Sequence, residues 1–138
     1  MERWNPWRAL RSRPIDLWFA PLDGDRGRWS SADGRDEILV EESLGRRHRR
    51  EVLAHELVHA ERRVGWPLAT AATMELEEER VWRVALCRLA PPAEVRGFLV
   101  RRGTIGPVTV ADVAEEFDLS IEAATRLLDL LRVRQGFP

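Results

Sequence analysis

The sequence predicts an α+β fold in which a small antiparallel sheet of about three strands packs against several helices. Stretches rich in strand-forming residues and bounded by turn residues fall within the first 42 positions. Long helical patterns, ended by glycine and proline, occupy much of the remainder. The chain has 138 residues, of which 44% are hydrophobic and 33% charged, and this suits one domain with its own core. We therefore expect a single domain over 1–138, with an N-terminal helix and sheet (1–42), two central helices (43–92) and a helical tail (105–134).

The N-terminal part begins with a short helix, for which Pro6 is a suitable first residue. A strand is expected over Ile15–Ala20, because "IDLWFA" is rich in strand-forming residues and a proline follows it. The stretch "RWSSADGRDEILVEE" then predicts a hairpin with strands Arg28–Ser31 and Glu37–Glu41 around an Asp33–Gly34 turn. Together these elements supply the expected sheet.

Two long helices are expected in the centre of the chain. The first covers about 44–64, and the second begins at about Ala69 or Thr73 and ends at Ala90. Glycine and proline are poorly tolerated inside helices, so they mark the expected ends. The residues in these positions are Gly65, Pro67, Pro91 and Pro92.

The tail of the chain predicts two short helices that resemble a helix-turn-helix. Thr109 with Asp112 caps the first of them, and Ser120 caps the second. Residues 109–131 carry six acidic side chains and one basic side chain, Arg126, which is a net charge of −5. Because DNA binding depends on neutralising phosphates, direct nucleic-acid binding by this tail is not expected. We expect its apolar residues to lie in the core: Val110, Val113, Phe117, Leu127 and Leu131.

The first central helix contains the stretch "EVLAHELVHAERR", in which His55 and His59 are four residues apart and Glu56 follows the first histidine. Residues i and i+4 lie on one helical face, so both imidazoles can reach one point. Glu56 lies at the edge of that face. This H-E-x-x-H pattern is typical of two zinc ligands and a carboxylate that accepts a proton from a metal-activated water. The alternative is an amphipathic helix that happens to carry these residues.

A catalytic zinc needs a third protein ligand, and the second helix offers four glutamates for this role. Apolar residues follow Glu78 at the helical spacings +3, +4, +7 and +11, so Glu78 best continues the buried stripe. A carboxylate in that position is costly unless a cation pairs with it. The alternative is that the glutamates form a solvated helix N-terminus, where the helix dipole favours them. The candidates are Glu75, Glu77, Glu78 and Glu79.

The stretch "AHELVHAE", followed by "EERVWRVALCRLAPP", resembles the ImmA/IrrE family of zinc metallopeptidases. The family has H-E-x-x-H on one helix, and on a second helix a glutamate ahead of a small-residue, leucine-rich stretch that ends in proline. The N-terminal "NPWRALRSRPIDLWF" is similar to compact members found in phage and prophage genomes. The resemblance covers about 5–131, and the zinc helix is its most diagnostic part.

The resemblance implies a zinc-dependent endopeptidase that cleaves a regulatory protein, such as a helix-turn-helix repressor. Carried over residue by residue, it implies His55, His59 and Glu78 as zinc ligands and Glu56 as the general base and acid. Glu75 and Glu79 remain alternatives for the third ligand. A second group must stabilise the negative charge that develops on the substrate carbonyl, and an arginine or His48 could serve. His48 itself is about two turns from His55, which is too far to bind the same metal ion.

An alternative hypothesis is a non-catalytic, zinc-containing regulatory or antitoxin-like module, and in one form of this hypothesis its tail associates with DNA. The intact Glu56 favours the enzyme. No apolar run is long enough for a membrane helix, the N-terminus does not look like a secretory signal, and the single cysteine, Cys87, makes the cytoplasm the expected compartment. The basic run "GRRHRRE" before the zinc motif is expected to face solvent, and the alternative is that it contacts an acidic partner surface.

Overall fold

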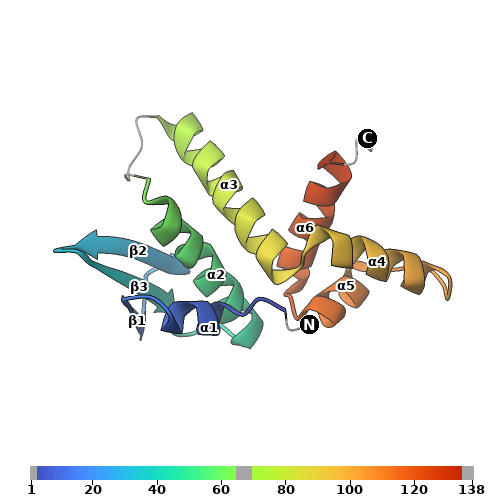
Figure 1. Ribbon diagram of the computed structural model, residues 1–138, viewed down its shortest axis with the longest axis horizontal. Helices are drawn as coiled ribbons and strands as arrows, with labels where there is room; N and C mark the ends of the chain where they lie inside the picture. The colour runs from blue at the N-terminus through green and yellow to red at the C-terminus, as the bar shows by residue number, and fades with distance from the viewer. Residues whose placement is uncertain (1–2, 65–69, 135–138) are drawn as a thin grey trace.

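The computed structural model describes residues 3–64 and 70–134, and within them it confirms the α+β class with three strands and six helices (Figure 1). The sheet lies on one side of the molecule with the first two helices, the last three helices lie on the other side, and the third helix runs between them. The elements in chain order are α1 (Pro6–Arg11), β1 (Ile15–Ala20), β2 (Gly27–Ala32), β3 (Arg35–Glu41), α2 (Arg46–Arg62), α3 (Ala71–Leu89), α4 (Pro92–Gly103), α5 (Val110–Phe117) and α6 (Ile121–Arg134).

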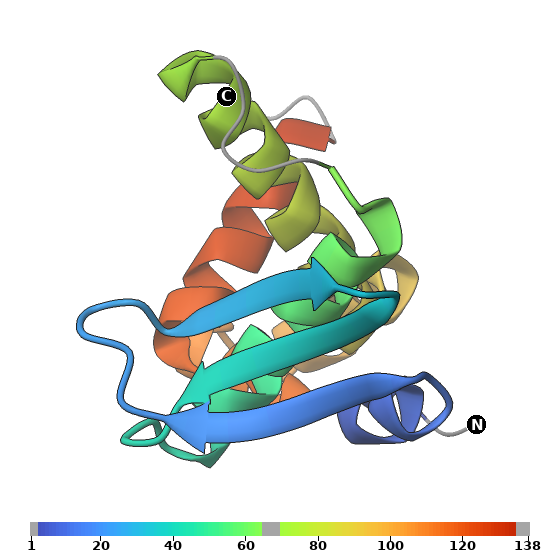
Figure 2. The same cartoon turned by 90° about the vertical axis from the view of Figure 1, so that its left-hand side faces the viewer.

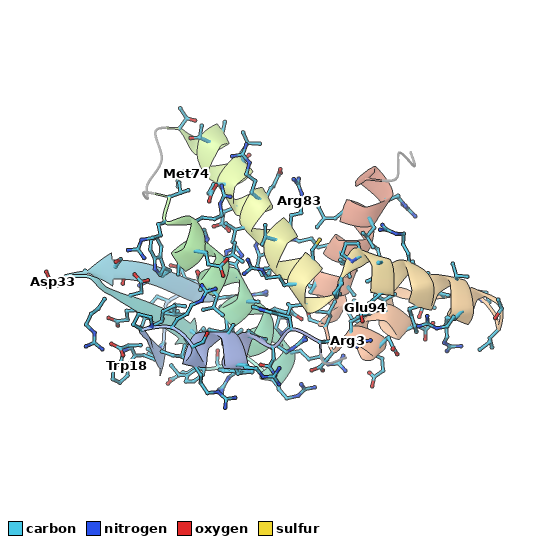
Figure 3. The ribbon with its side chains drawn as sticks, viewed as in Figure 1. Arg3, Trp18, Asp33, Met74, Arg83 and Glu94 are labelled. Atoms are coloured by element: carbon cyan, nitrogen blue, oxygen red, sulfur yellow. The ribbon has the colours of Figure 1, made fainter. Side chains whose placement is uncertain are left out.

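The sheet has the strand order β1-β3-β2, as Figure 2 shows with the three strands in front of α2. β2 and β3 form the expected antiparallel hairpin, and Asp33 and Gly34 both have positive φ, which a two-residue hairpin turn of this kind requires. Asp33 marks the tip of this hairpin in Figure 3.

The expectation of an entirely antiparallel sheet is wrong, because β1 pairs in parallel with β3. The turn chemistry fixes only the β2–β3 pair. The loop over 21–26 carries the chain across β3 to its far side, a distance of two strand spacings or roughly 10 Å, which six residues span easily. The direction of β1 is therefore set by tertiary pairing and not by any local signal.

The helix boundaries agree well with the sequence patterns. Asn5 caps α1 by accepting a hydrogen bond from the backbone N–H of Trp7 at 2.8 Å, and Thr70 caps α3. The expected stop signals Gly65 and Pro67, and the expected start at Ala69, lie outside the described residues. No helix in the described part of the chain is long and apolar enough to cross a bilayer.

Helix α4 was not expected from the sequence. The two prolines do end α3, but Pro92 also occupies the first turn of a new helix, where a missing N–H is tolerated. The two expected tail helices are present as α5 and α6. Thr109 and Asp112 form the capping box of α5, and Ser120 Oγ accepts a hydrogen bond from the N–H of Ala123 at 3.1 Å.

Helix α2 lies between two hydrophobic clusters. Toward the sheet, Val52, Leu53 and Leu57 pack with Ile38 and Val40 of β3. Toward the other helices, α2 contributes to a second cluster built with α3, α4, α5 and α6. Four of the five tail residues expected in this core are buried, and Val110 packs against it half-buried. As a result every residue from Glu51 to Val58 is buried.

The basic run at the start of α2 faces solvent only in part. Arg46 stays exposed and residues 47–50 are half-buried, because arginines of the run bind the acidic tail of the same chain. Arg46 forms two hydrogen bonds of 2.6 Å with the Asp118 carboxylate. Arg47 donates to Asp118 at 3.1 Å, and Arg50 donates to the Asp118 carbonyl oxygen at 2.8 Å. The buried Glu51 carboxylate accepts from the N–H of Ser120 at 2.6 Å. The negative charge of the tail therefore has a partner within the molecule.

Candidate metal centre

Helix α2 presents His55 and His59 to one point, as their spacing predicts. Their rings are nearly perpendicular, with centroids 4.7 Å apart, and their Nε2 atoms are 3.1 Å apart. His55 is only 7% exposed, because this face of α2 is covered by α3 and by the sheet hairpin. The enclosure keeps both rings in one arrangement.

Helix α3 brings Glu78 to the same point. One carboxylate oxygen of Glu78 lies 2.7 Å from His59 Nε2, and the other lies 3.1 Å from His55 Nε2. Within the described residues, these three side chains form the cluster able to hold a metal ion, with their ligand atoms within 4.8 Å of one another. Tetrahedral zinc with bonds of about 2.0–2.1 Å places its ligand atoms roughly 3.3 Å apart, so the donor set fits that ion.

The other three glutamates of α3 have different surroundings. Glu77 is the buried one, and its carboxylate pairs with Arg62 through two hydrogen bonds of 2.6 Å. The expectation that Glu78 continues the buried stripe is therefore wrong, because Glu77 occupies that position and has the cation that a buried carboxylate needs. Glu78 is half-exposed and faces the histidines. Glu75 and Glu79 are exposed and lie outside the cluster.

The surroundings shift the pKa of each group in a direction that follows from burial and pairing. Burial lowers the pKa of His55, although Glu78 partly offsets this effect. Burial alone would raise the pKa of Glu78, but hydrogen bonds from His55 and His59 hold it well below its usual value. For His59, burial lowers the pKa, and the carboxylates of Glu78 and Glu56 more than reverse this. The cluster is thus adapted to hold a charged carboxylate beside imidazoles.

Glu56 lies beside the cluster and is 4% exposed. Burial raises its pKa to about 7, and His59 only partly opposes that shift. Its Oε2 atom is buried and has no hydrogen-bond partner among the described residues. A carboxylate with a pKa near neutrality and a free oxygen is suited to accept and release a proton.

Strand β2 approaches Glu56 closely because residue 27 is a glycine. A Cβ atom added there would lie 2.4 Å from Val52 Cγ1 and 3.1 Å from Glu56 Cγ. Both distances are shorter than ordinary van der Waals contact. The sequence analysis did not identify Gly27, since nothing local distinguishes it from a turn glycine.

A cleft of about 840 Å³ joins the cluster to β2. It is lined by His55, Glu56, His59 and Glu78, and by residues 27–31 of β2. Because β3 is central in the sheet, the outer edge of β2 has no strand partner among the described residues, and this free edge borders the cleft. Arg26 and Arg28 also line it, whereas His48 does not.

Trp82 is a further residue of the site that the sequence analysis did not assign. It lies on α3 one turn after Glu78, and its ring contacts the His55 ring with centroids 4.2 Å apart. From α6, the guanidinium of Arg126 lies 4.8 Å from the Trp82 ring. The spacing of Glu78 and Trp82 by four residues was a usable signal, because it puts both on one face.

Comparison with known families agrees with this geometry. A family model described as the IrrE N-terminal-like domain, Peptidase_M78, matches residues 11–128 of the 138-residue chain. The matched region includes all four residues selected from the sequence: His55, Glu56, His59 and Glu78. None of the curated proteins matches the chain.

Proposed function

Because the chain belongs to the ImmA/IrrE family of metal-dependent peptidases, we propose that it is a zinc-dependent endopeptidase that cleaves a specific regulatory protein. The observation that carries the proposal is the convergence of His55, His59 and Glu78 on one point, with Glu56 beside it. The substrate class, a helix-turn-helix repressor or a similar regulator, is what the family resemblance implies, and it would place the activity in the cytoplasm.

We assign His55, His59 and Glu78 to the metal and Glu56 to proton transfer. A bound zinc ion would polarise the substrate carbonyl and lower the pKa of a water molecule to near ~7. Glu56, with its pKa near neutrality and a free oxygen, accepts the proton of the attacking water and returns it to the leaving amine. Burial of Glu56 favours both the uptake and the release of the proton. The charged and neutral forms of the buried carboxyl group are close in free energy at neutral pH.

The free edge of β2 is the proposed binding site for the substrate backbone. The backbone oxygen of Arg26 accepts from Glu41 N–H at 2.8 Å, and β2 pairs antiparallel with β3. Since bonded pairs alternate along such a ladder, the N–H groups of Gly27, Trp29 and Ser31 point away from β3. An extended peptide can add to this edge and pass in front of Glu56.

A positive group in the cleft is needed to stabilise the charge that develops on the carbonyl oxygen. The sequence offers an arginine or His48 for this role. Arginine is present in the cleft lining, as Arg26, which pairs with Glu122, and as Arg28, which pairs with Asp25. His48 is absent from that lining, which favours an arginine in this role.

The test separates the ligand role of Glu78 from the proton-transfer role of Glu56. Wild type, Glu56→Gln, Glu78→Gln and the control Glu75→Gln are purified with zinc present and analysed for bound metal. Cleavage is measured with a purified helix-turn-helix repressor encoded near the gene. We expect one zinc per chain in wild type, in Glu56→Gln and in Glu75→Gln, and much less in Glu78→Gln. Cleavage should fall by at least ~10²–10⁴-fold in Glu56→Gln and remain unchanged in Glu75→Gln.

Two results would contradict the proposal. Full cleavage by Glu56→Gln would exclude Glu56 as the general base. If wild type binds zinc and a regulator tightly but cleaves nothing, the non-catalytic regulatory module becomes the better account. A DNA-associated function requires salt-dependent DNA binding by the full chain, which we do not expect because arginines of α2 pair with the acids of the tail.

A further inference from the structure

The His55 ring is held in its orientation in an unusual way. Its Nε2 atom faces His59 and Glu78, so Nδ1 is the nitrogen turned away from the cluster. This Nδ1 atom is buried and has no hydrogen-bond partner among the described residues. In metal sites, the second nitrogen of a ligating histidine almost always donates to an oxygen, and that bond fixes the ring. Here the ring must be held in another way.

Trp82 is the side chain placed to hold it. The indole and the imidazole are tilted by 37° with centroids 4.2 Å apart, which is a stacking contact. Trp82 is half-buried and packs against the helical core, so it cannot move away freely. The contact covers a ring face and leaves the Nε2 direction open.

Arg126 in turn contacts Trp82 from α6. Its guanidinium carbon lies 4.8 Å from the centre of the Trp82 ring, within the range of a cation–π interaction. Within the part of the chain that the structure describes, the Arg126 guanidinium makes no hydrogen bond or ion pair. Arg126 lines a second cleft, of about 1100 Å³, which also includes Glu78, Trp82 and Arg83. Figure 3 shows Arg83 on the side of α3 that faces α6.

We propose that Trp82, held by Arg126, is a positioning residue that fixes the His55 ring by stacking where a hydrogen bond to Nδ1 is usual. Helix α6 thereby contributes to metal affinity without supplying a ligand. The inference rests on the proposed function, because it assumes that His55 binds the metal. It goes beyond that function in assigning a role to the indole and to the only basic residue in 109–131.

The experiment measures zinc affinity directly, by competition with a chelator, on the metal-free full chain. Trp82→Phe keeps an aromatic face, while Trp82→Leu keeps apolar bulk without one. Removing a group that orients a ligand typically weakens metal binding by ~10–100-fold, and we expect this for Trp82→Leu. Trp82→Phe should stay within a few-fold of wild type. The absorption spectrum of the Co²⁺-substituted protein reports ligand geometry, and it should change in Trp82→Leu only.

Arg126→Gln tests whether Arg126 holds Trp82 in place. Arg132→Gln is a matched control that removes one positive charge from the same helix. An exposed cation–π contact corresponds to about a two- to five-fold change in affinity. We therefore expect zinc binding to weaken by that factor in Arg126→Gln and to be unchanged in Arg132→Gln. Unfolding temperatures of the metal-free variants identify any that simply lose the fold.

The outcomes distinguish this inference from the proposed function. If wild type binds zinc but Trp82→Leu binds it equally well, stacking has no role and only the inference is wrong. If Phe and Leu weaken zinc binding in proportion to their loss of metal-free stability, Trp82 is a packing residue and the inference is again wrong. If wild type itself binds no zinc, both the inference and the proposed function fail.

Discussion

Glu56 and Glu78 are chemically identical side chains that the fold places in opposite electrostatic settings. The Glu78 carboxylate accepts hydrogen bonds from two imidazoles, and these outweigh its burial, so its pKa is lowered. Glu56 has one oxygen without a partner among the described residues, and burial raises its pKa to about 7. The sequence motif predicts both residues as candidates. The contrast between them depends on packing by β2 and α3, and no local pattern encodes it.

The raised pKa of Glu56 predicts a pH dependence of stability in the metal-free protein. The folded state binds the Glu56 proton more tightly than the unfolded state, so this contribution to stability is present at low pH and is lost as pH rises from about 4.5 to about 7. A shift of this size corresponds to about 3 kcal/mol. Metal-free Glu56→Gln should therefore gain stability relative to wild type over that range, beyond any constant offset. Urea unfolding at several pH values measures this, and a difference that does not vary with pH would contradict it.

Gly27 provides a second prediction, which concerns the space between β2 and α2. A methyl group at this position would lie 2.4 Å from Val52 Cγ1, so either the strand or the helix must shift. Such overpacking typically costs 1–3 kcal/mol, that is, about that much of the free energy of unfolding. Because Glu56 Cγ is the next nearest atom, at 3.1 Å, cleavage should fall as well.

The control for Gly27→Ala is Gly103→Ala, since a Cβ atom at Gly103 would meet nothing within 4 Å. Thermal unfolding and cleavage rate are measured for both variants. We expect Gly103→Ala to be neutral or slightly stabilising, because it lies at the end of α4. Equal behaviour of the two variants would show that the close approach of β2 to Glu56 has no consequence.

Among the elements, the hairpin and all the helices except α4 were predicted from local patterns, whereas α4 and the sheet order were not. Capping residues, prolines and the Asp33–Gly34 turn are local signals, and the elements they predict are present with small shifts in their ends. The parallel pairing of β1 with β3 depends on contacts distant in sequence. The same holds for the contacts between the arginines of α2 and the tail, where the separation is about 70 residues. The third-ligand candidate lies between these cases. Helical periodicity pointed to Glu78 by placing it in the buried stripe, which Glu77 occupies instead, whereas the family resemblance pointed to Glu78 directly.

For the secondary-structure elements, the prediction concerns β2, because this strand is the edge of the sheet that lines the cleft. Ser31→Pro removes an N–H that points away from β3, so it should leave the ladder intact and impair cleavage by removing a backbone contact to the substrate. Ser31→Ala controls for the hydrogen bond that the Ser31 hydroxyl accepts from Arg63 at 2.8 Å.

A proline substitution on the opposite edge of the sheet, in β1, provides a matched control. Ala20 O accepts from Glu42 N–H at 3.1 Å, and in the parallel register this turns the N–H of Phe19 outward on β1. Phe19→Pro should therefore retain cleavage as long as the protein stays folded, which circular dichroism checks. Full activity in Ser31→Pro, or equal losses in both proline variants, would count against substrate addition at β2.

In the whole molecule, the proposed metal site lies where two parts of the structure meet. Helix α2 belongs to both hydrophobic clusters, whereas α3 belongs to the helical one (Figure 1). A metal ion held by His55 and His59 of α2 and by Glu78 of α3 links these helices across a face that otherwise carries polar groups. Because only eight residues of sequence separate α2 from α3, closing this short stretch of chain adds little, and the metal ion acts mainly through its binding free energy.

Zinc binding should therefore raise the stability of the entire fold. A ligand that binds only the folded state at 100 times its dissociation constant adds about 2.7 kcal/mol to the free energy of unfolding. For a chain of this size, that corresponds to a rise of about 10 °C in unfolding temperature. Glu56→Gln should show the same rise, because Glu56 is not assigned to the metal, and Glu78→Gln should lose most of it. Differential scanning calorimetry with and without a chelator measures these shifts. An equal rise in Glu78→Gln and wild type would mean that zinc stabilises the protein from a different site, and the assignment of Glu78 as the third ligand would have to be abandoned.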